Sequence, residues 1–122
     1  ILPEQREHMA KSNYGATMRL GAYACRLKQG TKVHSAYGVN EICERHRHRY
    51  EFNNSYREAL ERKGLKISGI NKKRNLVEIV ELEKNQHPFF VGVQFHPEFL
   101  SRPLKPHPLF VGLIRAGMRS KI

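Results

Sequence analysis

The stretch Val91-Gly92-Val93-Gln94-Phe95-His96-Pro97-Glu98-Phe99 joins an apolar run to a histidine, a proline and a glutamate. The apolar run is typical of a buried strand, and Pro97 has no N–H to donate, so strand pairing should end just after Phe95. His96 and Glu98 would then lie at a strand end, where loops present side chains to ligands. A carboxylate can accept from one imidazole nitrogen, fix the tautomer and leave the other nitrogen as a base. The pattern therefore predicts a catalytic pair, with a surface histidine in a turn as the alternative.

Length and composition set the class of protein. The 122 residues, 39% of them hydrophobic, contain no apolar run near eighteen residues, which predicts one domain or part of one and no membrane span. The chain starts without an initiator methionine or a secretory signal, so we expect a segment of a longer protein. Cys25 and Cys43 have no CxxC or zinc spacing, and we expect two free intracellular thiols.

The charge is strongly basic. Twenty-two Lys and Arg residues against eleven Asp and Glu give a net charge of +11, which favours a binder of polyanions such as nucleotides or nucleic acid. The basic residues are scattered along the chain, so a solvated basic surface is the simpler explanation.

Periodicity and turn residues predict an α/β fold without internal repeats. Expected elements are a strand over 16–27 bent at Gly21, a helical turn over 33–37, a helix over 55–63, a hairpin of strands 65–70 and 76–82, a strand over 89–95, and a final helix over 108–118. In the helix over 55–63 we expect an apolar face of Tyr56, Ala59 and Leu60 and an ion pair between Glu58 and Arg62. In the final helix we expect a stripe that packs on the sheet: Leu109, Phe110, Leu113 and Ile114.

The segment 44–52 alternates basic and aromatic residues with the period of a strand. Arg45, Arg47 and Arg49 would share one face, and His46, His48 and Tyr50 the other. Such a polar run is not expected in a core. It could be a solvated strand face, a metal site that uses the two histidines but lacks an obvious third ligand, a carboxylate-binding site that uses an arginine, or a nucleic-acid patch with Tyr50 and Phe52 for stacking.

Several stretches resemble known proteins. Residues 94–99 resemble the His-Pro-Glu signature of class I glutamine amidotransferases. Residues 15–21, 44–53, 76–81 and 87–103 resemble, in that order, the C-terminal part of the glutaminase domain of the CTP synthase family, and the Arg-His-Arg-His-Arg-Tyr run is the most specific of these matches. The likeness extends from about Gly15 to Phe110. It implies an α/β amidotransferase fold, represented here by largely antiparallel strands and a terminal helix.

The resemblance also implies roles for individual residues. His96 matches the general base of the family, Glu98 its orienting carboxylate, and Arg49 the arginine that holds the substrate glutamine. Thr17, Arg19 and Leu20 fall in what resembles a lid over the glutamine site, a region associated with the activator GTP. The implied reaction is ATP-dependent amination of UTP to CTP with ammonia from glutamine.

The chain departs from the family pattern at the nucleophile. The family uses a cysteine on a glycine-flanked elbow, whereas Cys25 lies between Ala24 and Arg26, and Cys43 between Ile42 and Glu44. We therefore expect residues 1–122 to be a partial glutaminase domain, inactive alone and without a cofactor or metal of its own. The synthetase domain that would bind ATP, UTP and Mg²⁺ lies outside it.

For the complete protein the resemblance implies a cytoplasmic homo-oligomer, a tetramer, with no membrane or nucleic-acid partner. Two alternatives stay open. One is a catalytically inert amidotransferase-like module for assembly or regulation, and the other is a small basic nucleic-acid-binding domain.

Overall fold

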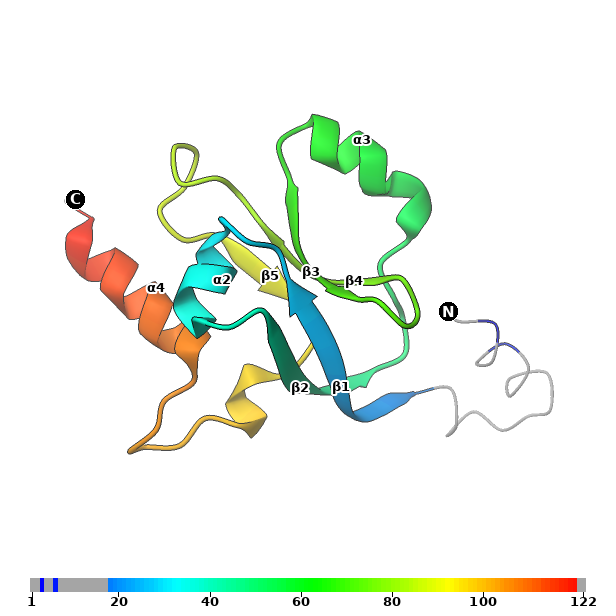
Figure 1. The fold of residues 1–122 in the computed structure, drawn as a ribbon, viewed down its shortest axis with the longest axis horizontal. Helices are drawn as coiled ribbons and strands as arrows, with labels where there is room; N and C mark the ends of the chain where they lie inside the picture. Colours follow the sequence, from blue (N-terminus) through cyan, green and yellow to red (C-terminus); the bar gives the residue numbers. More distant parts are fainter. Residues whose placement is uncertain (1–2, 4–5, 7–17, 121–122) are drawn as a thin grey trace.

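A single antiparallel sheet organises the chain (Figure 1). The computed structural model describes residues 3, 6 and 18–120. Its five strands lie in the order β2-β1-β3-β4-β5, with bounds β1 Arg19–Leu27, β2 Glu41–His48, β3 Lys66–Asn71, β4 Leu76–Glu81 and β5 Val91–Val93. Each neighbouring pair is antiparallel, as the sequence predicted.

The longest ladder joins β1 to β2, and glycines mark the bend in β1 and the end of the helix between the two strands. Gly21 within β1 has φ 95°, which fits the expected bend. Between the two strands lies α2 (Lys32–Tyr37), which begins where the Thr31 hydroxyl accepts from the His34 N–H and ends at Gly38 with φ 73°.

The core lies between the sheet and the helices α2 and α4 (Pro108–Arg119), which lie side by side in Figure 1. Its buried members are Cys25, Leu27, Val33, Ile42, Ile79, Phe95 and Leu109. Gly112 permits the close packing of α4, because a Cβ there would lie 2.9 Å from Phe89 Cε2.

The expected apolar stripe of the final helix is only partly buried. Leu109 is 6% exposed, but Phe110, Leu113 and Ile114 are 40%, 51% and 62% exposed, so the prediction that the whole stripe packs on the sheet is wrong. The reason is geometric: among the helices and strands α4 contacts mainly α2, which has only six residues and is too short to cover the twelve residues of α4.

The segment 54–62 forms a short 3₁₀ turn, η2 (Asn54–Tyr56), followed by α3 (Arg57–Arg62). The Asn53 side chain caps η2 by accepting from the Ser55 N–H. The predicted apolar face of the segment is not buried, with Tyr56 62% and Leu60 36% exposed. The i,i+4 ion pair joins Arg57 to Glu61 at 3.2 Å rather than Glu58 to Arg62.

The strand predicted over 89–95 is shorter, because only Val91–Val93 form β5. Just beyond Val93 the Gln94 N–H still bonds Glu78 O of β4, whereas the His96 N–H bonds Arg45 O of β2. The segment after β5 thereby crosses toward β2 (Figure 1).

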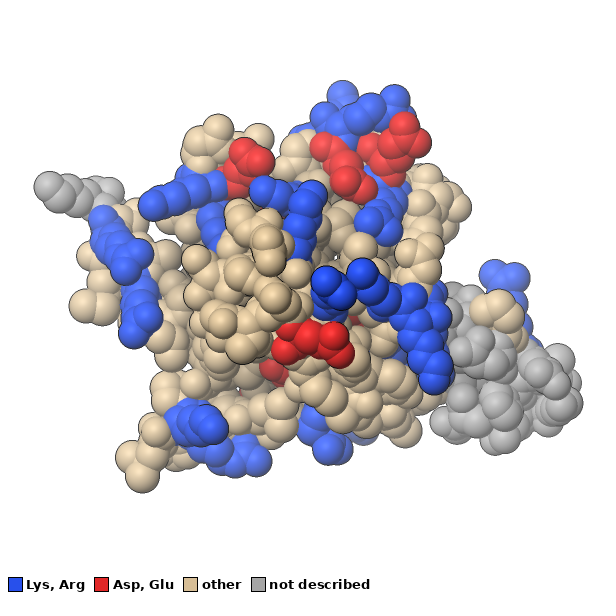
Figure 2. Space-filling model, in the orientation of Figure 1, with Lys and Arg blue, Asp and Glu red and all other residues tan. Residues whose placement is uncertain are grey.

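The basic surface is dispersed. Figure 2 shows Lys and Arg side chains in several separate groups, including one over α3 and one along α4, rather than in a continuous stripe. None of the helices in the described part of the chain is long and apolar enough to cross a membrane.

Candidate active site

The predicted pair forms at the turn after β5. His96 Nδ1 lies 2.6 Å from Glu98 Oε1, and the side chains are 37% and 56% exposed. Both groups therefore face solvent while contacting each other, as a base that must receive a substrate requires.

The local backbone explains why the two side chains meet. Pro97 opens the 3₁₀ turn η3 (Pro97–Phe99), and the Phe99 N–H donates to His96 O at 3.1 Å, which folds Glu98 back toward the imidazole. The ring of Phe99 stacks on that of His96 with centroids 4.7 Å apart and planes 10° apart. The His96 N–H, bonded to Arg45 O at 2.9 Å, fixes the turn to β2.

This geometry defines the protonation pattern of the pair. The hydrogen bond from His96 lowers the pKa of the Glu98 carboxyl, so the group is ionised at neutral pH and can only accept. The proton of a neutral imidazole must then lie on Nδ1, which leaves Nε2 with a lone pair. His96 can thus take a proton from a nucleophile at Nε2 and return it to a leaving group.

Arg49 directly follows β2, the strand to which the backbone of His96 is bonded. Its Nε is buried and has no hydrogen-bond acceptor within the described residues. A buried donor without an acceptor is costly, and a ligand carboxylate would supply the missing acceptor. This observation is compatible with the predicted role of Arg49, which remains a prediction.

The alternating segment is half buried, contrary to expectation. Glu44 and His46 on β2 are 3% and 2% exposed, whereas Arg45 and Arg47 face solvent. The period of two was correct, but a polar face can be buried when other elements supply partners. For His46, the partner is the fully buried Glu78 of β4, with His46 Nε2 3.3 Å from Glu78 Oε2.

Glu78 also contacts Arg19 of β1. Arg19 Nη1 lies 2.7 Å from Glu78 Oε1 and 3.3 Å from Glu51 Oε1, and all three side chains are at most 4% exposed. Glu78 Oε1 therefore faces the guanidinium of Arg19, and Glu78 Oε2 faces the imidazole of His46. Burial raises the pKa of the Glu78 carboxyl, against the opposing effect of Arg19.

The two histidines of β2 contact each other rather than solvent. His46 Nδ1 lies 2.8 Å from His48 Nε2, and His48 Nδ1 lies 3.0 Å from the carbonyl of Tyr50. Burial, followed by the charge of Arg19, lowers the pKa of His46 to about 3, and burial also lowers that of His48. Throughout the described residues, no group of three or more His, Cys, Asp or Glu side chains is arranged to hold a metal ion.

The three residues predicted for the lid fall in different settings. Thr17 lies outside the described residues. Arg19 is 2% exposed and points into the sheet toward Glu78, while Leu20 is 54% exposed. The buried ion pair gives Arg19 a structural role, and the lid assignment remains a prediction.

Neither cysteine has the surroundings of a nucleophile. Cys25 is 1% exposed in the core, and burial raises its pKa to about 12. Cys43 is exposed on β2 with both neighbours in extended conformation, not on an elbow.

A second buried polar group was not predicted from the sequence. The carboxylate oxygen Glu44 Oε1 accepts from the Tyr37 hydroxyl at 2.9 Å and lies 2.7 Å from His107 Nε2. His107 Nδ1 accepts from the Leu109 N–H and caps α4, so its proton lies on Nε2 and is donated to Glu44. This group joins α2, β2 and α4. Both buried polar groups contain a glutamate within a strand, Glu44 in β2 and Glu78 in β4. A glutamate in such a position is a sequence signal for a buried polar group, because a buried carboxylate needs a partner.

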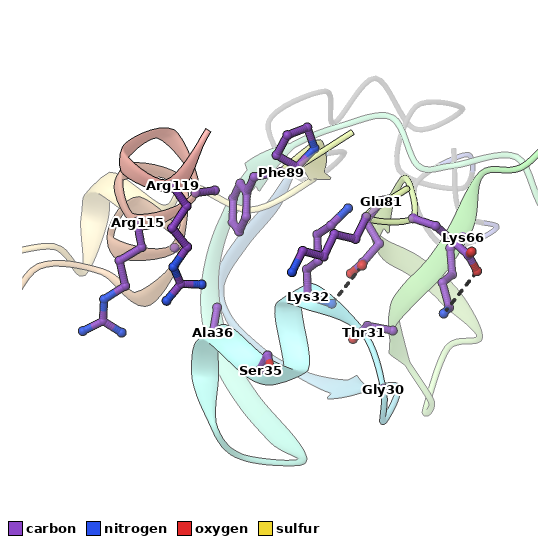
Figure 3. A pocket seen from close by; sticks show the side chains of 15 residues that line it. Gly30, Thr31, Lys32, Ser35, Ala36, Lys66, Glu81, Phe89, Arg115 and Arg119 are labelled. Atoms are coloured by element: carbon purple, nitrogen blue, oxygen red, sulfur yellow. Dashed lines mark hydrogen bonds and ion pairs between the residues drawn. The ribbon is translucent and has the colours of Figure 1, made fainter. Parts of the chain in front are cut away.

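A hollow lies elsewhere, between α2, α4 and the loop after β4 (Figure 3). Its volume is about 600 Å³, and its lining includes Lys32, Lys66, Arg115 and Arg119. The ammonium of Lys32 is already bonded to the carbonyls of Leu82 and His87, and that of Lys66 lies 3.7 Å from Glu83. His96 and Glu98 are not among the residues that line this hollow.

The fold and the contact between His96 and Glu98 agree with the class of protein expected from the sequence motifs. The family model for class-I glutamine amidotransferases matches residues 4–116, and the chain belongs to this family.

Relatives of the chain within this family are CTP synthases. The chain is 56% identical over 118 residues to a CTP synthase of Pelobacter propionicus and 54% identical over 114 residues to one of Coprothermobacter proteolyticus. These matches cover 97% and 93% of the chain but only 22% and 20% of the relatives, so the chain spans about a fifth of their length.

A solved structure agrees with this similarity. The glutaminase domain of Trypanosoma brucei CTPS, with bound acivicin, superposes with a TM-score of 0.75 at 36% identity, covering 86% of this chain and 42% of that one. The resemblance to the glutaminase domain of CTP synthases, expected from the sequence motifs, is thereby confirmed.

Proposed function

We propose that this chain supplies the general base and the substrate-binding arginine for glutamine hydrolysis in a CTP synthase. The observation that carries the proposal is the contact of 2.6 Å between His96 Nδ1 and Glu98 Oε1 in a solvent-accessible turn. The similarity to CTP synthases over 97% of the chain supports the choice of glutamine as substrate.

In the proposed reaction, Nε2 of His96 takes the proton of a cysteine thiol that lies outside residues 1–122. The thiolate attacks the carboxamide carbon, the C–N bond breaks, and His96 gives its proton to the departing ammonia. Water then hydrolyses the thioester to glutamate. Glu98 holds the imidazole in the required tautomer throughout, and the guanidinium of Arg49 binds the α-carboxylate of glutamine as a planar fork.

The rest of the proposal concerns the complete protein. The ammonia would aminate UTP in an ATP- and Mg²⁺-dependent step on a synthetase domain outside this chain, with GTP as activator acting near residues 17–20. We propose a cytoplasmic homo-tetramer as the active form.

The test replaces His96 by Ala in the complete protein that contains this chain. We expect loss of CTP formation from glutamine by at least about 10²-fold, the usual contribution of a general base, and normal CTP formation from free ammonia. If His96→Ala uses glutamine as well as the wild type does, the assignment is wrong. If the wild-type protein itself uses no glutamine, the alternative of an inert amidotransferase-like module is correct.

The isolated chain offers a second test. Without a nucleophile near His96, residues 1–122 should release no ammonia from glutamine, as measured by a coupled ammonia assay. Turnover that is inhibited by a cysteine-directed reagent would mean that Cys25 or Cys43 is the nucleophile.

A further inference from the structure

A continuous chain of contacts runs from the buried carboxyl of Glu78 to the backbone beside Arg49. Glu78 Oε2 faces His46 Nε2 at 3.3 Å, His46 Nδ1 faces His48 Nε2 at 2.8 Å, and His48 Nδ1 faces Tyr50 O at 3.0 Å. Tyr50 is the residue after Arg49, so the chain of contacts ends on the peptide between Tyr50 and Glu51, one residue beyond the arginine.

The direction of each hydrogen bond follows from its acceptor end. A carbonyl can only accept, so His48 Nδ1 carries a proton and donates to Tyr50 O. His48 is then neutral only if its Nε2 bears a lone pair, which accepts the proton of His46 Nδ1. A neutral His46 would consequently turn the lone pair of Nε2 toward Glu78.

Two lone pairs facing each other at 3.3 Å in a buried site repel, so this last contact requires a proton. The charges of the surrounding side chains agree. One guanidinium, Arg19, faces two carboxylates, Glu51 and Glu78, and one additional proton balances the three groups. Burial favours neutral forms of both Glu78 and His46, since it raises the pKa of the first and lowers that of the second.

We propose that Glu78 is a positioning residue for Arg49, acting through a proton that it shares with His46 and through the hydrogen bonds of His48. The inference rests on the proposed function, in which Arg49 binds the substrate carboxylate. Two other charged side chains flank this chain of contacts: Arg19 of β1, and Glu51, whose Oε1 lies 3.5 Å from His48 Nδ1. The ring centroids of Phe95 and His46 are 5.9 Å apart. In this proposal Glu78 does not touch substrate; it acts by holding the Tyr50 carbonyl, and with it the backbone next to Arg49, in place.

The test compares two substitutions in the complete protein. Glu78→Gln keeps the size and offers an amide N–H to His46 and an oxygen to Arg19, whereas Glu78→Leu is apolar and offers neither. For Glu78→Leu we expect the KM for glutamine to rise about tenfold or more, because small displacements of a binding group are costly, with the kcat and the ammonia-dependent rate near those of the wild type. For Glu78→Gln we expect a KM within about threefold of the wild type.

Two further variants keep the test decisive if Glu78→Leu folds poorly. His48→Phe retains the ring and removes the bond to Tyr50 O, and it should raise the KM for glutamine in the same way. Glu81→Leu is the matched control, because Glu81 is equally buried on β4 but accepts from the N–H groups of Lys32 and Val33 in α2. It should lower the unfolding temperature without changing that KM.

Each result decides the question. Unchanged KM values in both Glu78→Leu and His48→Phe would overturn the positioning role, and so would an equal rise in Glu81→Leu. A KM as high in Glu78→Gln as in Glu78→Leu would overturn the shared proton. An unchanged KM in Arg49→Leu would instead reject the proposed binding role of Arg49, and that outcome is independent of Glu78.

Discussion

The thiol of Cys25 should resist alkylation in the folded protein, whereas that of Cys43 should react quickly. Cys25 of β1 is 1% exposed and belongs to the core, whereas Cys43 of β2 is exposed. The comparison decides whether Cys25 could be the nucleophile that His96 requires, and Cys43 provides an internal control in the same molecule.

The expected difference follows from the thiolate population. Burial raises the pKa of Cys25 from 9.0 to about 12. Because only the thiolate reacts and each pKa unit is tenfold, the reactive fraction below pH 9 falls about 10³-fold relative to an unperturbed thiol. The packing around Sγ slows the reagent further, since a Cβ on Gly69 would lie 2.8 Å from it.

The assay is iodoacetamide labelling at pH 8, followed over time by mass spectrometry of the two cysteine peptides. We expect the Cys25 peptide to be labelled at least about 10³-fold more slowly than the Cys43 peptide, and at the same rate in 8 M urea, a concentration expected to unfold a domain of this size. Native labelling of Cys25 as fast as that of Cys43 would refute the reasoning and reopen Cys25 as a nucleophile.

Three further measurements test the packing and the site. Gly69→Ala should destabilise the fold by about 1–3 kcal/mol, because the new Cβ would lie 2.7 Å from Ile79 Cδ1 in a closed core, and urea unfolding would measure the change. Tyr37→Phe should lower the free energy of unfolding by about 1 kcal/mol through loss of the hydrogen bond to Glu44, measured in the same way. The contact of Glu98 with His96 lowers the pKa of Glu98 in the folded state, so it should persist above pH 4.5 and be lost only as the pH falls through the lower folded value, as an NMR titration of the carboxyl carbon would show.

Results in the opposite direction would be informative. Wild-type stability of Gly69→Ala would mean that β3 and β4 separate easily, and the same result for Tyr37→Phe would mean that His107 alone satisfies Glu44. A Glu98 carboxyl that titrates at or above 4.5 would show that the pair is not formed in solution.

Local signals in the sequence predicted most of the fold. Helix ends could be predicted because caps depend on neighbouring backbone groups alone: Gly38 ends α2, Asn53 caps η2, and Pro108 opens α4. The period of two along residues 44–52 also predicted which side chains of β2 share a face.

Long-range partners could not be predicted in this way. His46 is buried because Glu78 arrives from a strand more than thirty residues away, and periodicity carries no information about that pairing. The prediction that the apolar stripe of α4 is buried was wrong because spacing does not say which element covers a helix. Ile114 is 62% exposed although its spacing is that of a core residue. At the candidate site, the contact between His96 and Glu98 was predictable because only Pro97 separates them.

The hydrogen bond from the His96 N–H to Arg45 O attaches His96 to β2, the strand that Arg49 directly follows. A displacement of β2 would therefore carry the proton acceptor and the guanidinium together and leave their spacing unchanged. Under the proposed function, accepting a longer or shorter amino-acid amide would therefore require a change in the loop of Arg49 itself, because a movement of β2 does not change the distance between His96 and Arg49.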